Sequence, residues 1–145
     1  MQDFIAVLDF GSQYAHLISK RIRHIGAYTR IFSPSSNENS LAKAKGIVLS
    51  GGPASVNSSN IPEFNSKLLE LDKPILGLCY GHQLIAQSFG GSISNTGKGE
   101  FGKAILKQKS DSPLWENISF PNQVWMSHQD SVTKCPEEFE ITAET

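Results

Sequence analysis

The alternation of apolar runs with helically spaced apolar residues constrains this chain more than any other sequence feature. Residues 4–8 (FIAVL) form a continuous apolar run, which is typical of a strand buried on both faces of a sheet. The next apolar residues recur at helical spacing from Ala15 to Ile25, with Ser12 as a candidate N-cap and Gly26 as a stop. A strand followed by a helix is the repeating unit of a parallel sheet covered by helices.

The same alternation continues as far as Gly91, and beyond it short strand-like pieces are separated by Gly, Pro, Ser and Asn. No further amphipathic helix follows, and the last feature is a strand in progress. We therefore expect an α/β fold, an open, doubly wound, mostly parallel sheet with flanking helices, truncated at its C-terminal end. The expected strands are residues 4–8, 28–32, 46–49, 75–78, 104–106, 123–126 and 140–143, and the expected helices are 15–25, 39–43, 64–71 and 84–89.

Length and composition exclude several classes of protein. The 145 residues fit one domain, residues 1–145, and 39% hydrophobic residues suffice for an ordinary core. The chain has 13 basic and 14 acidic side chains, a net charge of −1. It therefore lacks the excess positive charge that binding to nucleic acid or to an anionic membrane requires. No apolar run approaches the ~18 residues of a membrane span. Two cysteines and the lack of a signal-peptide pattern lead us to expect a cytoplasmic protein.

The strongest chemical signal is the segment 74–83 (PILGLCYGHQ). An apolar strand delivers Cys79 at its carboxyl end, Gly77 and Gly81 flank it, and a helix follows at once. This is the cysteine form of a nucleophile elbow, a strained turn that needs glycines where side chains would collide. A helix N-terminus also lowers a thiol pKa and offers free backbone N–H groups to developing negative charge. We therefore favour a nucleophilic Cys79 over a buried structural cysteine.

A glycine pair, Gly51 and Gly52, follows the strand at 46–49. Bare backbone there can bring N–H donors close to an oxyanion, although a tight turn explains the glycines equally well. The loops after two neighbouring parallel strands open at the same sheet edge, where ligands bind in such folds. This shared position favours an oxyanion-binding loop.

A cysteine nucleophile needs a base, usually histidine, held by a carboxylate or amide. His16 and His24 belong to the surface of the first helix, and His82 should point away from the thiol on the helix after the elbow. His128 lies in a polar loop and is a candidate substrate contact. No spacing in the sequence suggests a His–Glu pair, so no histidine stands out as the base.

Five motifs in order resemble the class I glutamine amidotransferases of the GMP synthetase type. They are DFGSQY (9–14), LSGGP (49–53), GLCYGHQ (77–83), EFG (100–102) and VWMSHQD (124–130), and they cover almost the whole chain. The elbow alone would fit any class I amidotransferase, whereas the first and last motifs favour this branch.

The resemblance implies that Cys79 attacks the side-chain amide of L-glutamine, giving a glutamyl thioester and ammonia. It further implies that the backbone N–H groups of Gly52 and Tyr80 form the oxyanion hole. Ammonia would then pass to an ATP- and magnesium-dependent synthetase domain or subunit that aminates xanthosine monophosphate to GMP, in purine nucleotide biosynthesis. This chain itself would hold no cofactor and no metal. The positions that match the family's glutamine pocket are Gln83, Ser127, His128 and Asp130.

Two departures from the family pattern leave alternatives open. The family's catalytic His and Glu lie in an F-H-P-E segment, and its synthetase part carries a phosphate-binding loop; this sequence contains neither. We therefore expect the 145-residue chain alone to be weakly active or inactive. The alternatives are a different class I amidotransferase and a base-less module that binds glutamine without turnover.

Overall fold

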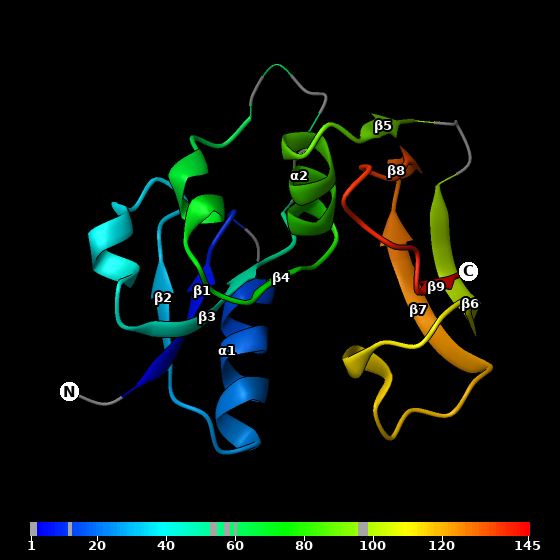
Figure 1. Cartoon of the computed structure of the whole chain (residues 1–145), viewed down its shortest axis with the longest axis horizontal. Coiled ribbons are helices and arrows are strands. Elements are labelled where there is room, and N and C mark those ends of the chain that lie inside the picture. Colours follow the sequence, from blue (N-terminus) through cyan, green and yellow to red (C-terminus); the bar gives the residue numbers. More distant parts are fainter. Residues whose placement is uncertain (1–2, 12, 53–54, 57–58, 60, 96–98) are drawn as a thin grey trace.

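The computed structural model describes residues 3–11, 13–52, 55–56, 59, 61–95 and 99–145. A four-stranded parallel sheet runs in the order β2-β1-β3-β4 (Figure 1). Its strands are β1 Phe4–Leu8, β2 Thr29–Phe32, β3 Ala44–Leu49 and β4 Ile75–Gly77. These four strands lie within a residue or two of the predicted ones, and the parallel pairing confirms the predicted α/β sheet.

Helices cover both faces of this sheet because its strands bury alternate side chains on each face. On one face Val7 and Val48 pack against Ala15 of α1, Tyr14–His24. On the other face Leu8 and Leu49 join a larger core with Tyr80 and other side chains from the connecting segments. That side carries the 3-10 helices η1 Glu38–Leu41 and η2 Ser66–Glu70 and the helix α2 Tyr80–Ser88.

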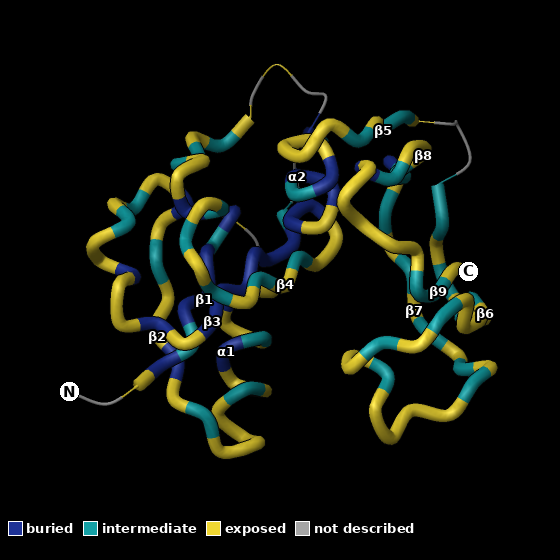
Figure 2. The backbone as a smooth tube through the Cα atoms, viewed as in Figure 1, coloured by how far each residue is buried: buried dark blue, intermediate teal, exposed yellow. Residues whose placement is uncertain are grey.

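Figure 2 shows the deepest burial along β1, β3 and the start of α2. The side chains of Ala6, Val7 and Leu8 are fully inaccessible to solvent. Two predicted helices are shorter than expected: the segments 39–43 and 64–71 form 3-10 turns rather than α-helices. Their asparagine caps, Asn37 and Asn65, start tight turns that run for a few residues only. The predicted cap Ser12 lies outside the described residues, whereas Gly26 ends α1 with φ +97° as expected.

Antiparallel strands form the rest of the molecule, beside α2 (Figure 1). The strands β6 Glu100–Gln108 and β7 Asn122–His128 pair along their length, and β9 Ala143–Glu144 adds to β6. A second ladder pairs β5 Ser92–Ser94 with β8 Ser131–Lys134. The sequence predicted β6 and β7 as shorter pieces, missed β5 and β8, and placed a strand at 140–143, where only Ala143 belongs to β9. A 3-10 turn, η3 Pro113–Trp115, lies between β6 and β7.

Among the described residues, no helix is both long enough and apolar enough to cross a membrane.

The glycines on each side of Cys79 allow α2 to pack directly on the sheet. A Cβ on Gly81 would lie 2.6 Å from the Leu49 Cβ, and one on Gly77 would lie 2.6 Å from the His82 backbone nitrogen. We predict that Gly77→Ala and Gly81→Ala each destabilise the fold by about 2 to 3 kcal/mol or more, because backbone atoms must move apart. Urea unfolding measures this effect.

Gly26→Ala is the control for these two variants. A Cβ there meets no atom within 4 Å, so only the positive φ of +97° is penalised, at about 1 to 2 kcal/mol. A Gly77→Ala protein no less stable than Gly26→Ala would contradict the packing argument.

Candidate active site

Cys79 occupies a sharp turn between β4 and α2. Its φ of +48° and ψ of −110° lie in a region that non-glycine residues rarely adopt. The turn is held by the Leu78 N–H, which donates to the Leu49 carbonyl at 3.0 Å, and by the Gly81 N–H, which donates to the Leu78 carbonyl at 2.9 Å. The strained strand-to-helix elbow predicted from the sequence is therefore present, with Cys79 exposed at its tip.

The protonation state of Cys79 differs from the expectation. Burial raises the pKa of the Cys79 thiol, whereas the sequence predicted a lowered pKa at a helix N-terminus. The reason is that the elbow takes part of the thiol out of water, and loss of hydration disfavours the thiolate. The thiol is therefore protonated at neutral pH and needs a base before it can act as a nucleophile.

The Gly51–Gly52 loop lies against this elbow. A Cβ on Gly51 would lie 3.5 Å from the Cys79 Cβ, and one on Gly52 would lie 3.1 Å from the Phe10 carbonyl oxygen. Ser50 holds the loop in place, because its buried hydroxyl accepts from the Phe10 N–H at 3.2 Å and donates to the Gly51 carbonyl at 2.9 Å. The two loops proposed to share a sheet edge thus meet at Cys79.

The candidate oxyanion donors are backbone N–H groups on the two sides of this meeting point. Tyr80 is the first residue of α2, so its N–H has no acceptor within the helix. Within the described part of the chain, neither the Tyr80 nor the Gly52 N–H donates to a protein acceptor. Free donors beside a thiol are what a developing oxyanion requires. The Tyr80 side chain plays no part, because its phenol is 2% exposed in the core, where burial raises its pKa.

Three of the predicted pocket residues, Gln83, His128 and Asp130, come together at the first turn of α2. Gln83 is 6% exposed, and its Nε2 donates to the Asp130 carbonyl at 2.8 Å. His128 Nδ1 contacts the same carbonyl oxygen at 3.0 Å. Ser127 does not join them: its exposed side chain lies on the opposite face of β7 from His128, because successive strand residues alternate.

His128 has a carboxylate partner, Glu100, which no spacing in the sequence suggested. His128 Nε2 lies 3.1 Å from a Glu100 carboxylate oxygen, and the other Glu100 oxygen accepts from the Thr145 hydroxyl at 2.8 Å. Glu100 and His128 face each other across β6 and β7, in an antiparallel register that sequence spacing does not reveal. His128 is accordingly at the end of a strand and not in a loop.

The partners of His128 limit its chemical role. Its Nδ1 lies 3.0 Å from the Asp130 carbonyl oxygen and its Nε2 lies 3.1 Å from a Glu100 carboxylate oxygen, so both ring nitrogens are engaged with protein groups. A ring engaged at both nitrogens leaves neither of them free to take a proton from a thiol. This geometry argues against His128 as the general base.

The pKa of His82 is shifted by its surroundings. Loss of hydration lowers the pKa of His82, and the charge of His128 lowers it further, so the ring is neutral at pH 7. His16 and His24 lie exposed on α1, as predicted.

Sequence reasoning missed two residues of this region. Glu100 pairs with His128, and Ser55 donates a hydrogen bond to the Asp130 carboxylate. Glu100 belongs to the EFG motif, one of the five motifs of the family resemblance, but no function was predicted for this residue. Ser55 lies in a polar stretch with no pattern of its own.

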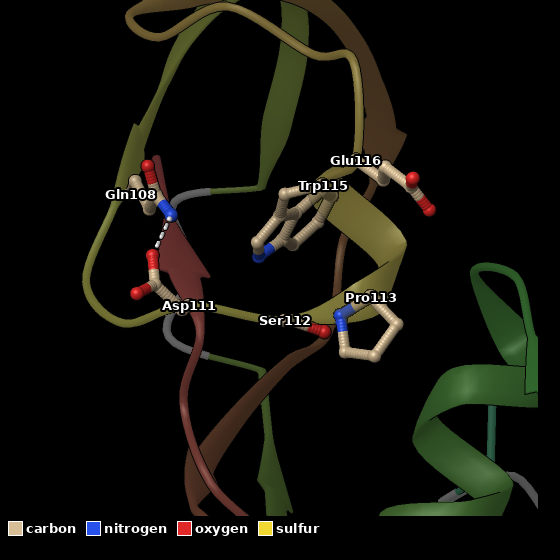
Figure 3. Close-up of a pocket in the computed structure, with 6 residues that line it drawn as sticks. All are labelled: Gln108, Asp111, Ser112, Pro113, Trp115 and Glu116. Atoms are coloured by element: carbon tan, nitrogen blue, oxygen red, sulfur yellow. Dashed lines mark hydrogen bonds between the residues drawn. The ribbon is translucent and has the colours of Figure 1, made fainter.

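A hollow of about 420 Å³ lies elsewhere, around η3 in the connection between β6 and β7 (Figure 3). Trp115 lines it, and its indole N–H has no partner among the described residues. None of its lining residues belongs to the elbow or to the cluster around Asp130. In the described ranges, no three His, Cys, Asp or Glu side chains gather as a metal site.

Known protein sequences include a family and individual proteins that this chain resembles. Residues 6–145 match the family model for glutamine amidotransferase class-I. The GMP synthase (glutamine-hydrolysing) of Petrotoga mobilis is 45% identical over 141 residues, and that of Pyrobaculum aerophilum is 44% identical over 144. The matches cover 97% and 96% of this chain but 28% of each relative. The chain thus spans little more than a quarter of these curated relatives.

Solved structures agree with the sequence matches. A Thermoplasma acidophilum protein assigned as one subunit of GMP synthase has a TM-score of 0.84 and 30% identity, with 99% of this chain and 72% of that chain covered. A glutamine amidotransferase of Thermotoga maritima has a TM-score of 0.74 at 17% identity, with 97% of this chain and 66% of that chain covered. The second structure supports the fold alone.

The raised pKa of Cys79 predicts how its reactivity depends on pH. In a Cys135→Ser protein, the rate of alkylation by iodoacetamide should rise about tenfold per pH unit at neutral pH and level off above the ~8.5 of an ordinary thiol. The reason is that only the thiolate reacts, and partial burial opposes its formation. Rates measured between pH 6 and pH 10 give the profile.

A Cys79→Ser protein serves as the control, because it reports Cys135 alone, whose thiol donates to the Phe139 carbonyl at 3.5 Å. A plateau for Cys79 below pH 8 would show an activated thiolate and would contradict the effect of burial.

Proposed function

The chain belongs to the class I glutamine amidotransferase family, and we propose that its elbow hydrolyses the side-chain amide of glutamine to supply ammonia for GMP synthesis. The observation that carries the proposal is the meeting of an exposed Cys79 with the free N–H groups of Gly52 and Tyr80. The names of the relatives, GMP synthase (glutamine-hydrolysing), support the choice of glutamine and of this branch of the family.

In the proposed reaction, the Cys79 sulfur attacks the carbonyl carbon of the glutamine side-chain amide. The carbonyl oxygen gains negative charge, which the Gly52 and Tyr80 N–H groups stabilise. The C–N bond then breaks, and the proton removed from the thiol is returned to the nitrogen, so that ammonia leaves. Water hydrolyses the resulting thioester to glutamate and restores the thiol.

We propose that the glutamine pocket extends from the elbow toward Gln83 and His128, with Asp130 beside them. Gln83 and His128 both contact the Asp130 backbone carbonyl, which joins the three residues in one polar cluster. Ser127 stays in the proposed pocket by resemblance alone.

We assign the general base to neither His82 nor His128. His128 has both ring nitrogens engaged with protein groups, and His82 belongs to α2 itself, the helix that follows the elbow. By resemblance, a His and a Glu of an F-H-P-E segment would supply the base and its orienting carboxylate in the full-length protein.

We further propose that the 145 residues are one part of an amidotransferase domain that works with a synthetase part. That part would use ATP and magnesium to aminate xanthosine monophosphate, and no step at the elbow involves either. The two free thiols are typical of a reducing compartment such as the cytoplasm.

Replacing the nucleophile tests the proposal directly. In the full-length protein, Cys79→Ser should lower ammonia release from glutamine to near the background rate, since loss of a triad nucleophile can reduce kcat by ~10⁶-fold. Cys135→Ser should remain close to wild type, because this thiol lies in the 135–139 segment, where it donates to the Phe139 carbonyl. Retention of more than a tenth of the activity by Cys79→Ser would refute the proposed nucleophile.

The proposed base predicts a difference between the short chain and the full-length protein. The 145-residue chain should release ammonia roughly 10² to 10⁴ times more slowly, the usual effect of losing general acid–base catalysis. Equilibrium dialysis with labelled glutamine measures binding separately from turnover. Equal turnover by the two proteins would refute the external base and would make His82 or His128 the base.

A further inference from the structure

Asp130 is a buried acidic residue whose carboxylate and backbone carbonyl both have protein partners. It is 6% exposed and follows β7. Its carboxylate accepts a hydrogen bond from the Ser55 hydroxyl, and its backbone carbonyl lies within hydrogen-bond distance of Gln83 Nε2 at 2.8 Å and of His128 Nδ1 at 3.0 Å. We call these residues, Asp130 with Ser55, Gln83 and His128, the Asp130 hub.

The hub joins three segments that are distant in the sequence. Ser55 is separated from Asp130 by 75 residues and follows the Gly51–Gly52 loop closely along the chain. Gln83 lies in the first turn of α2, where its own N–H donates to the Cys79 carbonyl at 3.0 Å. His128 ends β7 and is anchored to β6 through Glu100.

The placement of these segments gives the hub a mechanical role. The helix α2 stands between the four-stranded sheet and the antiparallel strands (Figure 1). The elbow and the glycine loop belong to the first part, and the 127–130 segment belongs to the second. Asp130 therefore connects the end of β7 with the two segments that hold Cys79 and the proposed oxyanion donors, the elbow and the Gly51–Gly52 loop.

We propose that Asp130 is a positioning residue for glutamine turnover, acting through Ser55 and Gln83 and not by touching the substrate. This inference rests on the proposed function. A carboxylate that bound the ammonium group of glutamine would need an open side, whereas this carboxylate is buried and accepts from Ser55. Loss of the hub leaves buried polar groups unpaired and allows the end of β7 to shift. A misplacement of about 1 Å in the site can lower a rate by ~10²-fold.

Substitutions at the two ends of one hydrogen bond separate positioning from direct contact. In the full-length protein, Asp130→Ala and Ser55→Ala should each lower kcat/KM for glutamine by about tenfold to 10²-fold, mainly through kcat. The double variant should lose no more than the worse single variant, because both remove the same link. Asp130→Asn should recover most of the activity lost in Asp130→Ala, since its amide oxygen still accepts from Ser55. Asp111→Ala, an exposed aspartate near η3, is the matched control.

Hydrogen exchange gives a readout that does not depend on activity. Asp130→Ala and Ser55→Ala should both speed amide exchange in the first turn of α2 and in the 127–130 segment, and Asp111→Ala should do so in neither.

The outcomes distinguish the two proposals. If Asp130→Asn is as impaired as Asp130→Ala and its loss falls on KM, then Asp130 contacts glutamine and the positioning role is wrong. If Ser55→Ala resembles wild type in both rate and exchange, the Ser55–Asp130 hydrogen bond does not position the site, and the inference is overturned. If the wild-type protein does not hydrolyse glutamine, the proposed function fails and the positioning role fails with it, even where exchange still reports an intact hub.

Discussion

The direct contact of α2 with the sheet is the constraint on which the rest of the site depends. Gly81 has no Cβ where the Leu49 side chain would meet it, and Gly77 has none where the backbone of Gly81 and His82 passes. The helix therefore begins within a few residues of the strand end, with no room for a looser loop. Cys79 takes up the sharp change of direction with its φ of +48°, a conformation that typically costs about 1 to 2 kcal/mol for a non-glycine residue. The packing of two glycines thus compensates for strain at one cysteine, and it leaves the thiol at the tip of the turn.

This position has a chemical consequence that opposes the effect of the helix N-terminus. The same close packing that exposes the tip also removes water from part of the thiol, and burial raises its pKa. The nucleophile is thus well placed but protonated at neutral pH, so it depends on a base for its activation. The two histidines of this region are held in different ways. His128 has both ring nitrogens engaged, by the Asp130 carbonyl and the Glu100 carboxylate, whereas loss of hydration, and then the neighbouring His128, lower the pKa of His82. Neither ring is thus presented as a ready base for the thiol.

Local patterns in the sequence were sufficient for the parallel sheet and the elbow, and insufficient for contacts between distant strands. The FIAVL run and the strand before Cys79 are each specified by neighbouring residues, so β1 and β4 were predicted to within about a residue. The Glu100–His128 pair depends on the register of β6 with β7, which no spacing rule encodes, and it was missed. The strands β5 and β8 are short and partly polar, so they carry no apolar signal. The sign of the Cys79 pKa shift was also wrong, because burial of a side chain is a property of packing and not of motif.

The partners of Asp130 show why the antiparallel part belongs to the same site as the parallel sheet. A buried carboxylate is unfavourable unless its oxygens are hydrogen-bonded, so a chain that keeps one there must also keep its donors in place. The Ser55 hydroxyl, in the segment after the glycine loop, donates to this carboxylate, and Gln83, in the helix after the elbow, donates to the Asp130 backbone carbonyl. Gly99 adds to this constraint, since a Cβ there would lie 2.9 Å from the His128 carbonyl oxygen, so β6 can approach the same segment closely. The polar cluster therefore couples the geometry around Cys79 to the pairing of β6 with β7, two parts of the chain that belong to separate sheets.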